Sequence, residues 1–489
     1  MKKKYQALFY LLTTLLGVVT MAIVGCGGGG GPITSGGGGT TTPTSPSAAF
    51  VALLPAGQAG ATLVGKEKCA TCHADNATHV AGTLHASKNV SCENCHGPGS
   101  AHAAAPAKTN ILTFPNVTQN VVCAQCHGPI TDQYLGSKHA KPVENFVGLA
   151  APYSNVATCF RCHSGNFRAQ YVDGPIGKGK TPAEVDTAIL ALTEDEKGIA
   201  AAGIHATAEC VTCHDPHMAT TNLLANGEQK QLRRATVNMD ATGIGPGATV
   251  ATYTTYNQMC GSCHNTRGAN PADSALSTGT SRSAVHHGPE MNMLLGASGV
   301  EKNDIGVQSP ARRVGTHASA PDQCVTCHLP NASHTFTVKL DQSCVPCHSP
   351  ADAAARKTAL QNEVMGDLAH LQSELSAWAV AKYGAGNTTS WDYTSNITAG
   401  QTVPVQSTVP IEIKRARYNY WYVIIDNSYG VHNPFYTRFM LQIAQDNINE
   451  LNGTSVPLIV PRAVSSQQLK TFVTSERARE KAGYAHVLN

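Results

Sequence analysis

The sequence predicts a mainly α-helical protein with extensive irregular loops and a unit of long helices near its C-terminus. Three observations lead to this prediction: side chains suited to a conventional core are sparse, one cysteine-containing pentapeptide recurs eight times, and amphipathic helical patterns follow its last copy. Of the 489 residues only 6% are aromatic, whereas 45 are glycine and 26 are proline. A chain of this length usually forms about two to four domains. We therefore expect something other than side chains to fill much of the interior.

The recurring pentapeptide is Cys-x-x-Cys-His, and its eight copies contain all but one of the 17 cysteines. Two thiols at this spacing can form thioethers with the two vinyl groups of one haem, and the adjacent histidine then becomes the proximal iron ligand. Half of a zinc site and a redox dithiol are the competing interpretations of Cys-x-x-Cys. A histidine after every copy favours haem, and the eight copies exclude a disulfide scaffold, a zinc ribbon and a nucleic-acid-binding module.

The motifs predict eight covalently attached haem c groups, which we number as sites 1 to 8 in the order of the chain. The predicted haem-attaching residues are Cys69, Cys72, Cys92, Cys95, Cys123, Cys126, Cys159, Cys162, Cys210, Cys213, Cys260, Cys263, Cys324, Cys327, Cys344 and Cys347. The predicted proximal ligands are His73, His96, His127, His163, His214, His264, His328 and His348.

The N-terminus has the pattern of a lipoprotein signal peptide. Lys2 to Lys4 form a positive n-region, and Phe9 to Val24 form an apolar h-region that is short for a transmembrane helix. Cys26 is the only cysteine outside the repeated motifs, which predicts cleavage after residues 1–25 and lipidation of Cys26. An ordinary signal peptide with an unrelated cysteine is the alternative. The three lysines account for the formal net charge of +3, so the mature chain is neutral and haem propionates would make it acidic.

Composition divides the rest of the chain. Residues 26–60 are predicted to be the lipidated cysteine and a linker, because a segment rich in glycine, serine, threonine and proline cannot bury enough apolar surface to order itself. Residues 61–350 carry all eight motifs and form the predicted octahaem domain. Residues 351–453 are predicted to be a helical unit, and residues 454–489 a C-terminal tail.

Three helices are predicted in the C-terminal unit. The second lies near residues 412–427 and is rich in aromatic side chains, so we expect this unit to pack on the octahaem domain. The third begins with Asn433 as N-cap and Pro434 as first helical residue, and it ends near Gly453. The apolar face of the first helix consists of Leu360, Val364, Leu368, Leu371, Leu375 and Trp378.

Thirteen histidines lie outside the motifs, and eight of them would give every haem a second axial histidine. His102, His217 and His334 each follow a motif closely. A residue of extended chain spans only about 3.5 Å, so these side chains cannot reach round the porphyrin to the far face of their own haem. We therefore expect each of them to ligate a neighbouring haem, which would link the haems into one array.

Other histidines precede a motif within a short loop and share contexts such as Leu-His-Ala-Ser and Thr-His-Ala-Ser. His286 and His287 are adjacent, so only one is expected to bind iron, and we favour His287. His79 is expected to pack against other side chains, and His370 and His486 to face solvent. The predicted distal ligands are His85, His102, His139, His205, His217, His287, His317, His334 and His432.

His432 lies in the turn between the second and third helices, in the sequence D-x-S-x-G-x-H-N-P from Asp426 to Pro434. Gly430 suits the left-handed position after a helix, so the turn is expected to hold His432 rigidly, as a metal ligand requires. This turn, and the succession of a histidine, a motif and a second histidine from His85 to His102, resemble a superfamily. It comprises pentahaem nitrite reductase, octahaem tetrathionate reductase and hydroxylamine oxidoreductase. The chain is also similar to the lipoprotein multihaem cytochromes of metal-respiring bacteria.

The resemblance implies that His432 is a distal haem ligand and that the long helices support the haem array and oligomer contacts. Two features depart from the enzymes of the superfamily. Nitrite and tetrathionate reductases have a lysine as proximal ligand at the catalytic haem, whereas all eight motifs here end in histidine. Hydroxylamine oxidoreductases cross-link a tyrosine to their active haem, but Tyr418, Tyr420 and Tyr422 lie on a predicted helix, where tyrosines usually belong to the core.

The sequence therefore predicts an electron carrier rather than an enzyme, because nine candidate distal ligands for eight sites leave no iron open. We expect a lipid-anchored relay at the periplasmic or cell-surface face of the outer membrane. Its expected partners are other multihaem cytochromes and a metal or small oxyanion acceptor, nucleic acid is excluded, and a homo-oligomer is left open. The alternatives are a haem oxidoreductase acting on nitrite, hydroxylamine or tetrathionate, and a subunit of an extracellular cytochrome filament.

Overall fold

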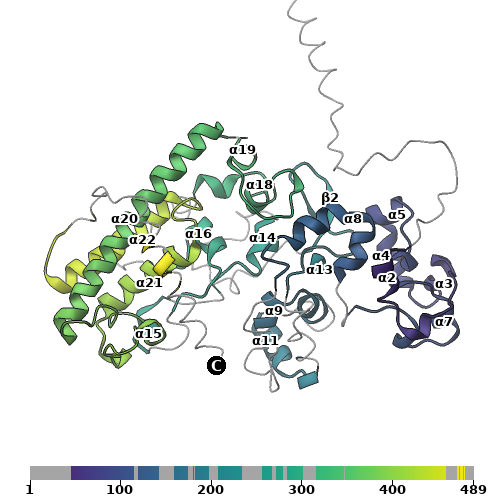
Figure 1. Cartoon of the computed structure of the whole chain (residues 1–489), viewed down its shortest axis with the longest axis horizontal. Coiled ribbons are helices and arrows are strands. Elements are labelled where there is room, and N and C mark those ends of the chain that lie inside the picture. Colours follow the sequence, from purple (N-terminus) through teal and green to yellow (C-terminus); the bar gives the residue numbers. More distant parts are fainter. Residues whose placement is uncertain are drawn as a thin grey trace, which may run out of the picture. The chain divides into compact units, whose positions relative to one another are not determined.

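The computed structural model describes residues 46–114, 119–141, 159–173, 180, 182–195, 197, 207–233, 256–266, 271–278, 284–300, 315–345, 347–456, 458, 471–472, 474–476 and 478. Cys26, His205 and His486 lie outside these residues, as do the predicted signal peptide and most of the predicted tail. The described part is mainly helical with irregular connections, which confirms the predicted fold class (Figure 1).

Most helices before residue 350 are short. In chain order they are α2 (Ala48–Val51), η1 (Ala56–Gln58), α3 (Lys66–Ala70), α4 (Ala74–Ala81), α5 (Leu84–Ser87), α6 (Cys92–His96), α7 (Ser100–Ala104), η2 (Lys108–Asn110), α8 (Gln119–Leu135), α9 (Phe160–His163), α10 (Gly165–Phe167), the π-helical η5 (Arg168–Val172), α11 (Pro182–Leu190), α13 (Cys210–Cys213), α14 (Tyr256–Gly261), α15 (Asp273–Thr278), α16 (Glu290–Leu295), η9 (Thr316–Ser319), α18 (Cys324–His328), η10 (Pro330–Ala332) and α19 (Leu340–Ser343).

The described strands are β1 (Asn222–Leu223) and β2 (Gln229–Leu232), which pair antiparallel. Asn222 lies opposite Leu232 and Leu223 opposite Gln229, so the register is irregular between the two pairs. This small hairpin follows motif 5, and an isolated bridge joins His214 of that motif to Leu232. The strands therefore brace a haem motif and do not form a sheet core.

The folded part begins earlier than the composition predicted. Ser47 is the first residue of the compact unit that extends to Asn489, and its hydroxyl accepts a hydrogen bond from the Phe50 backbone amide at the start of α2. Phe50 is 2% exposed and packs with Leu112 and Val122. A short apolar run in residues 47–60, within the predicted linker, thus packs on the chain near motif 3.

Three long helices build a conventional core in the C-terminal part: α20 (Pro350–Tyr383), α21 (Ile411–Asp426) and α22 (Pro434–Asn452), with the short turns η11 (Thr394–Asn396) and η12 (Gln406–Thr408) between the first two (Figure 1). The predicted apolar face of the first helix is confirmed, because Val364, Leu368, Leu371 and Leu375 are fully buried. His370 is partly buried on the same helix and its Nε2 atom is inaccessible, so the expectation that it faces solvent is wrong.

The caps of these helices follow the sequence signals. The Asn433 side chain accepts a hydrogen bond from the backbone amide of Tyr436, Pro434 is the first helical residue, and Gly453 ends α22 in the left-handed conformation. α21 ends at Asn427, which is left-handed, so Gly430 is not the residue that terminates it. Gly430 instead lies in the turn with φ +95°, where an added Cβ would approach Leu360 to 3.2 Å.

α21 is buried along nearly its whole length, including its polar side chains. The Trp421 indole donates to Asp392 Oδ1 at 2.8 Å, and the Tyr420 hydroxyl donates to Glu476 Oε2 at 2.7 Å. Tyr422 donates its hydroxyl proton to the carbonyl of Ala297, which joins this helix to the segment after α16. The aromatic residues that we expected to pack on the octahaem domain thus do contact a part of it. Within the described residues, no helix is both long and apolar enough to cross a membrane.

Asn419 is the polar residue that fastens α21 to its neighbours. Its Nδ2 donates to the carbonyls of Val300 and Met440, both at 3.0 Å, and its Oδ1 accepts from the Val300 amide at 2.8 Å. Asn419→Ala would remove the side-chain partner of the buried amide and carbonyl of Val300, at about 1–3 kcal/mol each, while the Met440 carbonyl keeps its bond within α22, so we expect the free energy of unfolding to fall by about 2 kcal/mol or more. Denaturant unfolding followed by far-ultraviolet circular dichroism measures the loss.

The matched control is Gln442→Ala, which removes an exposed amide of α22 that bonds only to Asp446. Its effect should stay within about 0.5 kcal/mol. Equal losses in the two variants would contradict the role given to Asn419.

Candidate haem sites

The histidines of the described structure meet in pairs. Each pair joins the histidine of one motif to a histidine outside the motifs, with ring centroids 5.4–6.3 Å apart. The pairs are His73–His102 (6.2 Å), His127–His85 (6.2 Å), His96–His217 (5.9 Å), His264–His139 (6.1 Å), His163–His287 (5.4 Å), His214–His334 (6.3 Å) and His328–His432 (6.3 Å). Seven of the eight motifs thus have a second imidazole opposite their own.

The spacing of the paired rings fits a metal atom between them. Two metal–nitrogen bonds of about 2 Å each, with half an imidazole on either side, place the ring centres about 6 Å apart. Six pairs lie at 5.9–6.3 Å and meet this requirement. His163 and His287 are closer, with Nε2 atoms 3.2 Å apart, so these two rings would have to separate to hold an iron.

Backbone carbonyls orient many of these rings through the other nitrogen. An imidazole whose Nδ1 donates to a carbonyl keeps the Nε2 lone pair free for a metal. The carbonyl partners are Leu112 for His96 (2.8 Å), Ala107 for His102 (3.1 Å), Lys230 for His214 (2.8 Å), Val431 for His317 (2.6 Å), Phe336 for His328 (3.3 Å) and Ala332 for His334 (2.9 Å). The fold thus orients the rings of predicted proximal and predicted distal ligands alike.

Three rings use a carboxylate in place of a carbonyl. The Nδ1 of His264 lies 3.2 Å from Glu290 Oε2, that of His348 lies 3.2 Å from Asp352 Oδ2, and that of His432 lies 2.7 Å from Asp426 Oδ1. The sequence analysis did not assign these carboxylates. Asp426 stands in the quoted turn and Asp352 one helical turn after His348, so both had a local signal, whereas Glu290 had none.

The two kinds of partner affect the imidazoles differently. Burial lowers the pKa of His214 to about 4, and its bond to the Lys230 carbonyl offsets this only in part. Burial also lowers the pKa of His264, but the charge and hydrogen bond of Glu290, together with the thiols of Cys263 and Cys260, outweigh it and raise the pKa to about 9. The same competition between burial and Asp426 holds the pKa of His432 above its ordinary value. Rings bonded to a carboxylate therefore carry more negative charge density when they ligate as neutral imidazoles.

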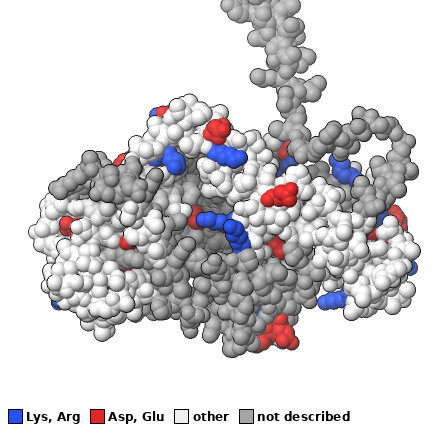
Figure 2. Space-filling model, in the orientation of Figure 1, with Lys and Arg blue, Asp and Glu red and all other residues white. Residues whose placement is uncertain are grey.

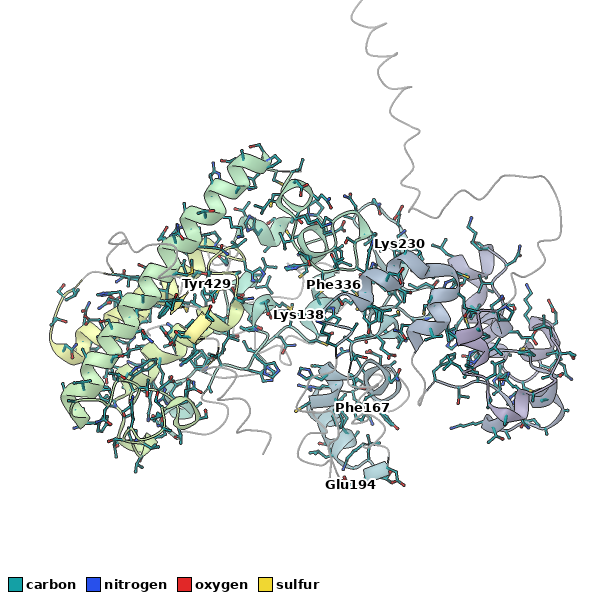
Figure 3. All side chains as sticks on the ribbon, viewed as in Figure 1. Lys138, Phe167, Glu194, Lys230, Phe336 and Tyr429 are labelled. Carbon is teal, nitrogen blue, oxygen red and sulfur yellow. The ribbon has the colours of Figure 1, made fainter. Side chains whose placement is uncertain are left out.

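Phe336 connects two of the pairs. Its ring, labelled in Figure 3, lies edge-on against His139 at 4.4 Å and against His334 at 5.9 Å. One aromatic side chain thus contacts a predicted ligand of site 6 and a predicted ligand of site 5. Phe114 packs edge-on against His96 in the same manner, at 5.0 Å. Aromatic side chains are scarce in this part of the chain, and these two occupy the space beside the ligands.

Cysteines of different motifs are neighbours. Burial and the thiol of Cys92 raise the pKa of Cys69 to about 11, and burial and the thiol of Cys126 do the same for Cys95. The thiol of Cys123 also interacts with that of Cys210, Cys162 with Cys263, and Cys260 with Cys324, while Cys260 and Cys344 act electrostatically on Cys213 and Cys327.

The helices that carry the motifs show the same neighbours. α3 contacts α6, α8 contacts α13, α14 contacts α18, and α18 contacts α19. Together with the thiol interactions, these give the order 1–2–3–5–6–7–8, with site 4 beside site 6. Other contacts cross this order, because α10 after motif 4 contacts α13 of motif 5, and His217 after motif 5 faces His96 of site 2. The predicted sites thus form one contiguous array.

The remaining predicted ligands are placed as follows. His317 is oriented by the Val431 carbonyl, but no other histidine ring faces it among the described residues. The same holds for His348, the proximal residue of site 8, within the described part of the chain. His286 stacks on His287 at 4.1 Å, while His287 is the residue that faces His163. His79 is exposed on α4, so packing is not its role. His205 lies outside the described residues.

Comparison with known proteins gives one family match. The model of a family described as cytochrome c554 and c-prime matches residues 54–97, which hold motifs 1 and 2. No curated protein matches the chain significantly. Together with the repeated motifs, the family match supports a multihaem c-type cytochrome.

Two solved structures are similar over most of the chain. One is the undecahaem cytochrome from the S-layer of Carboxydothermus ferrireducens (19% identity, TM-score 0.44, covering 74% of this chain and 50% of that one). The other is the outer cell wall cytochrome OcwA (18% identity, TM-score 0.44, covering 73% of this chain and 70% of that one). The chain thus spans about half the length of the S-layer cytochrome.

The pairing of His73 with His102 generates a prediction. His102→Ala removes the ring opposite His73, so site 1 should become five-coordinate and one haem in eight should turn high-spin. Resonance Raman and optical spectra of the purified holoprotein measure the high-spin fraction. His79→Ala is the matched control, because His79 is exposed on a nearby helix and faces no described ring. A fully low-spin His102→Ala protein would contradict the pairing.

Proposed function

We propose that this chain is an electron-transfer protein that holds eight haem c groups in one contiguous array and keeps their irons six-coordinate. The observation that carries the proposal is the pairing of imidazoles, one from a motif and one from elsewhere, at seven of the eight motifs. When bound, haem c supplies a one-electron couple of ferric and ferrous iron.

The residues of the chain have three tasks in this proposal. The two cysteines of each motif would attach the porphyrin, and the paired imidazoles would bind its iron. A second imidazole excludes substrates from the metal, and two imidazoles give a lower potential than histidine with methionine. The carbonyls and carboxylates at Nδ1 hold the rings that they contact in the ligating tautomer.

The distribution of distal ligands supports transfer between sites. His102 follows motif 2 but faces His73 of site 1, and His217 follows motif 5 but faces His96 of site 2. His334 follows motif 7 and faces His214 of site 5. Each of these histidines lies a few residues from one motif and faces the histidine of another. The short backbone between them therefore limits the distance between the two sites.

Site 8 is the position where an enzymatic function would be located. No described histidine faces His348, and His317 and His205 are the predicted distal ligands that lack a described partner ring. We propose that His317 completes the ligand set, since its Nδ1 is already bonded to a carbonyl as in the paired residues. The alternative is an oxidoreductase that binds nitrite, hydroxylamine or tetrathionate at an open site 8.

Haem content and spin state test this proposal. We expect eight haems per chain by the pyridine haemochromogen assay of the denatured protein, all of them low-spin in the native protein, and one high-spin haem in His317→Ala. A count of six or fewer would contradict the octahaem assignment. If the unmodified protein contains a high-spin haem that reacts with nitrite, hydroxylamine or tetrathionate, the electron-carrier proposal is contradicted and the oxidoreductase alternative is supported.

We also propose that the mature protein is exported and lipid-anchored at Cys26, with other multihaem cytochromes as redox partners and a metal or oxyanion as terminal acceptor. The support is the signal-like N-terminus and the requirement of covalent haem attachment for an exported protein. Charged side chains are scattered over the face shown in Figure 2, and this face presents the mixed surface expected of a protein that meets partners transiently.

Cys26→Ala should move the protein from the membrane fraction to the soluble fraction without loss of haem, because Cys26 belongs to no haem motif. Fractionation with haem staining measures both quantities in one experiment. Conversion of the exposed Lys88 to Ala, far from the N-terminus in sequence, serves as a control that should leave the distribution unchanged. Equal membrane retention of the Cys26→Ala protein would show that the anchor is something else.

A further inference from the structure

The carboxylates that contact ligating histidines differ in burial and in their other partners. The side chain of Asp426 is fully buried, that of Glu290 is 30% exposed, and that of Asp352 is 42% exposed. Asp352 shares both oxygens with the Arg356 guanidinium, at 2.8 Å each, so most of its charge is compensated. Within the described residues, neither Asp426 nor Glu290 pairs with a lysine or arginine.

Asp426 is held in a fixed geometry. Its Oδ1 lies 2.7 Å from His432 Nδ1, while its Oδ2 accepts hydrogen bonds from the Ser428 hydroxyl and, at 3.3 Å, from the Ser428 backbone amide. The Ser428 hydroxyl oxygen in turn accepts from the His432 backbone amide at 3.1 Å. The carboxylate, the serine and the imidazole therefore form a closed ring of hydrogen bonds, and His432 is the only cationic-capable group that Asp426 meets within the described residues.

A carboxylate at Nδ1 makes a ligating imidazole more basic, and a more basic ligand stabilises ferric over ferrous iron. The charge acts more strongly where burial excludes water. The lowering of the reduction potential should be largest where the carboxylate is most buried and is not paired with a cation. We therefore expect it to be largest for Asp426, smaller for Glu290 and smallest for Asp352. Rings bonded to carbonyls, such as His96 and His214, lack this effect.

We propose that Asp426 is a positioning residue that, through His432, makes site 7 the most reducing of the eight, and that Glu290 acts in the same sense but more weakly on site 6 through His264. Sites 6 and 7 are neighbours, since α14 of motif 6 contacts α18 of motif 7. The most reducing part of the array therefore lies inside it, between motifs 5 and 8. This inference rests on the proposed function, because it requires iron at His264 and His432.

A spectroelectrochemical titration of the holoprotein tests the inference. Asp426→Asn keeps the shape of the side chain and one oxygen that can accept from His432 Nδ1, but it removes the charge and replaces the oxygen that accepts from Ser428 by an amide nitrogen. We expect the midpoint potential of the most reducing step to rise by 59 mV or more, which is a tenfold change in the equilibrium constant of a one-electron reduction. Glu290→Gln should raise a different step by less, and the matched control Asp352→Asn should move no step by as much as either.

Two outcomes overturn the inference: an Asp426→Asn protein with all steps unchanged, and an Asp352→Asn protein that shifts as far as the Asp426 variant. If the Asp426→Asn protein does not load haem, Ser428→Ala replaces it. That change keeps the carboxylate and removes a donor from it, so the same step should become more reducing, and a shift in the opposite direction or no shift overturns the inference.

His432→Ala separates this inference from the proposed function. One high-spin haem in that variant establishes iron at His432, so unchanged steps in Asp426→Asn would then count against the role of Asp426 alone. A His432→Ala protein whose haems all remain low-spin would instead count against the ligand set of site 7 and hence against the proposed function.

Discussion

The hydrogen bond from imidazole Nδ1 to a neighbouring oxygen is the interaction on which the arrangement of this protein depends. A ring free to rotate about its side-chain torsions would pay the entropy of ordering each time it met a metal. Here the partner oxygen fixes the ring and its tautomer before any ligand arrives, for His96 and Leu112 as for His214 and Lys230. Since the oxygens belong mostly to the backbone, the loops themselves define the geometry. A loop without regular secondary structure can therefore fix the position of one imidazole nitrogen through a backbone carbonyl.

The two parts of the molecule are stabilised by different means. The C-terminal helices bury Trp391, Tyr420, Trp421 and Tyr436 in a core of the ordinary kind. The part with the motifs has only small apolar clusters among its described residues, such as Phe50 with Leu112 and Val122. Covalent and coordinate bonds to haem would supply there what packing does not. The contacts of α21 with Val300 and Ala297 join the C-terminal helices to the part with the motifs. The helices can therefore act as a rigid support for the sites next to them.

Much of this organisation could be predicted from the sequence, because the strongest signals are local. Five consecutive residues are enough to recognise Cys-x-x-Cys-His as a haem-attachment motif. Likewise, Asn433 and Gly453 are recognised as helix caps from the residues next to them. The face of α20 follows from a periodicity of the same kind. The docking of Phe50 could not be read in this way, because its partners Leu112 and Val122 are distant in sequence.

The choice of partner rings was open for the same reason. Spacing indicated that His102 cannot serve its own motif, but it did not indicate which of the other motifs it faces. Glu290 is the clearest case of a missing signal. It is a single acidic residue at the start of α16, and only the fold brings it to His264. Long-range contacts between polar side chains leave no periodic trace in a sequence.

The pairing of rings from distant motifs has a consequence for the way the chain must fold. His96 belongs to the second motif, yet its partner His217 is made only after three further motifs have followed. A chain exported from its N-terminus would therefore expose a half-ligated site 2 throughout that interval, while His102 and other histidines compete for it. Contacts of such long sequence separation slow folding, because the loop must close before any bond repays its entropy. Site 2 would therefore be completed only after motif 5 has left the export machinery.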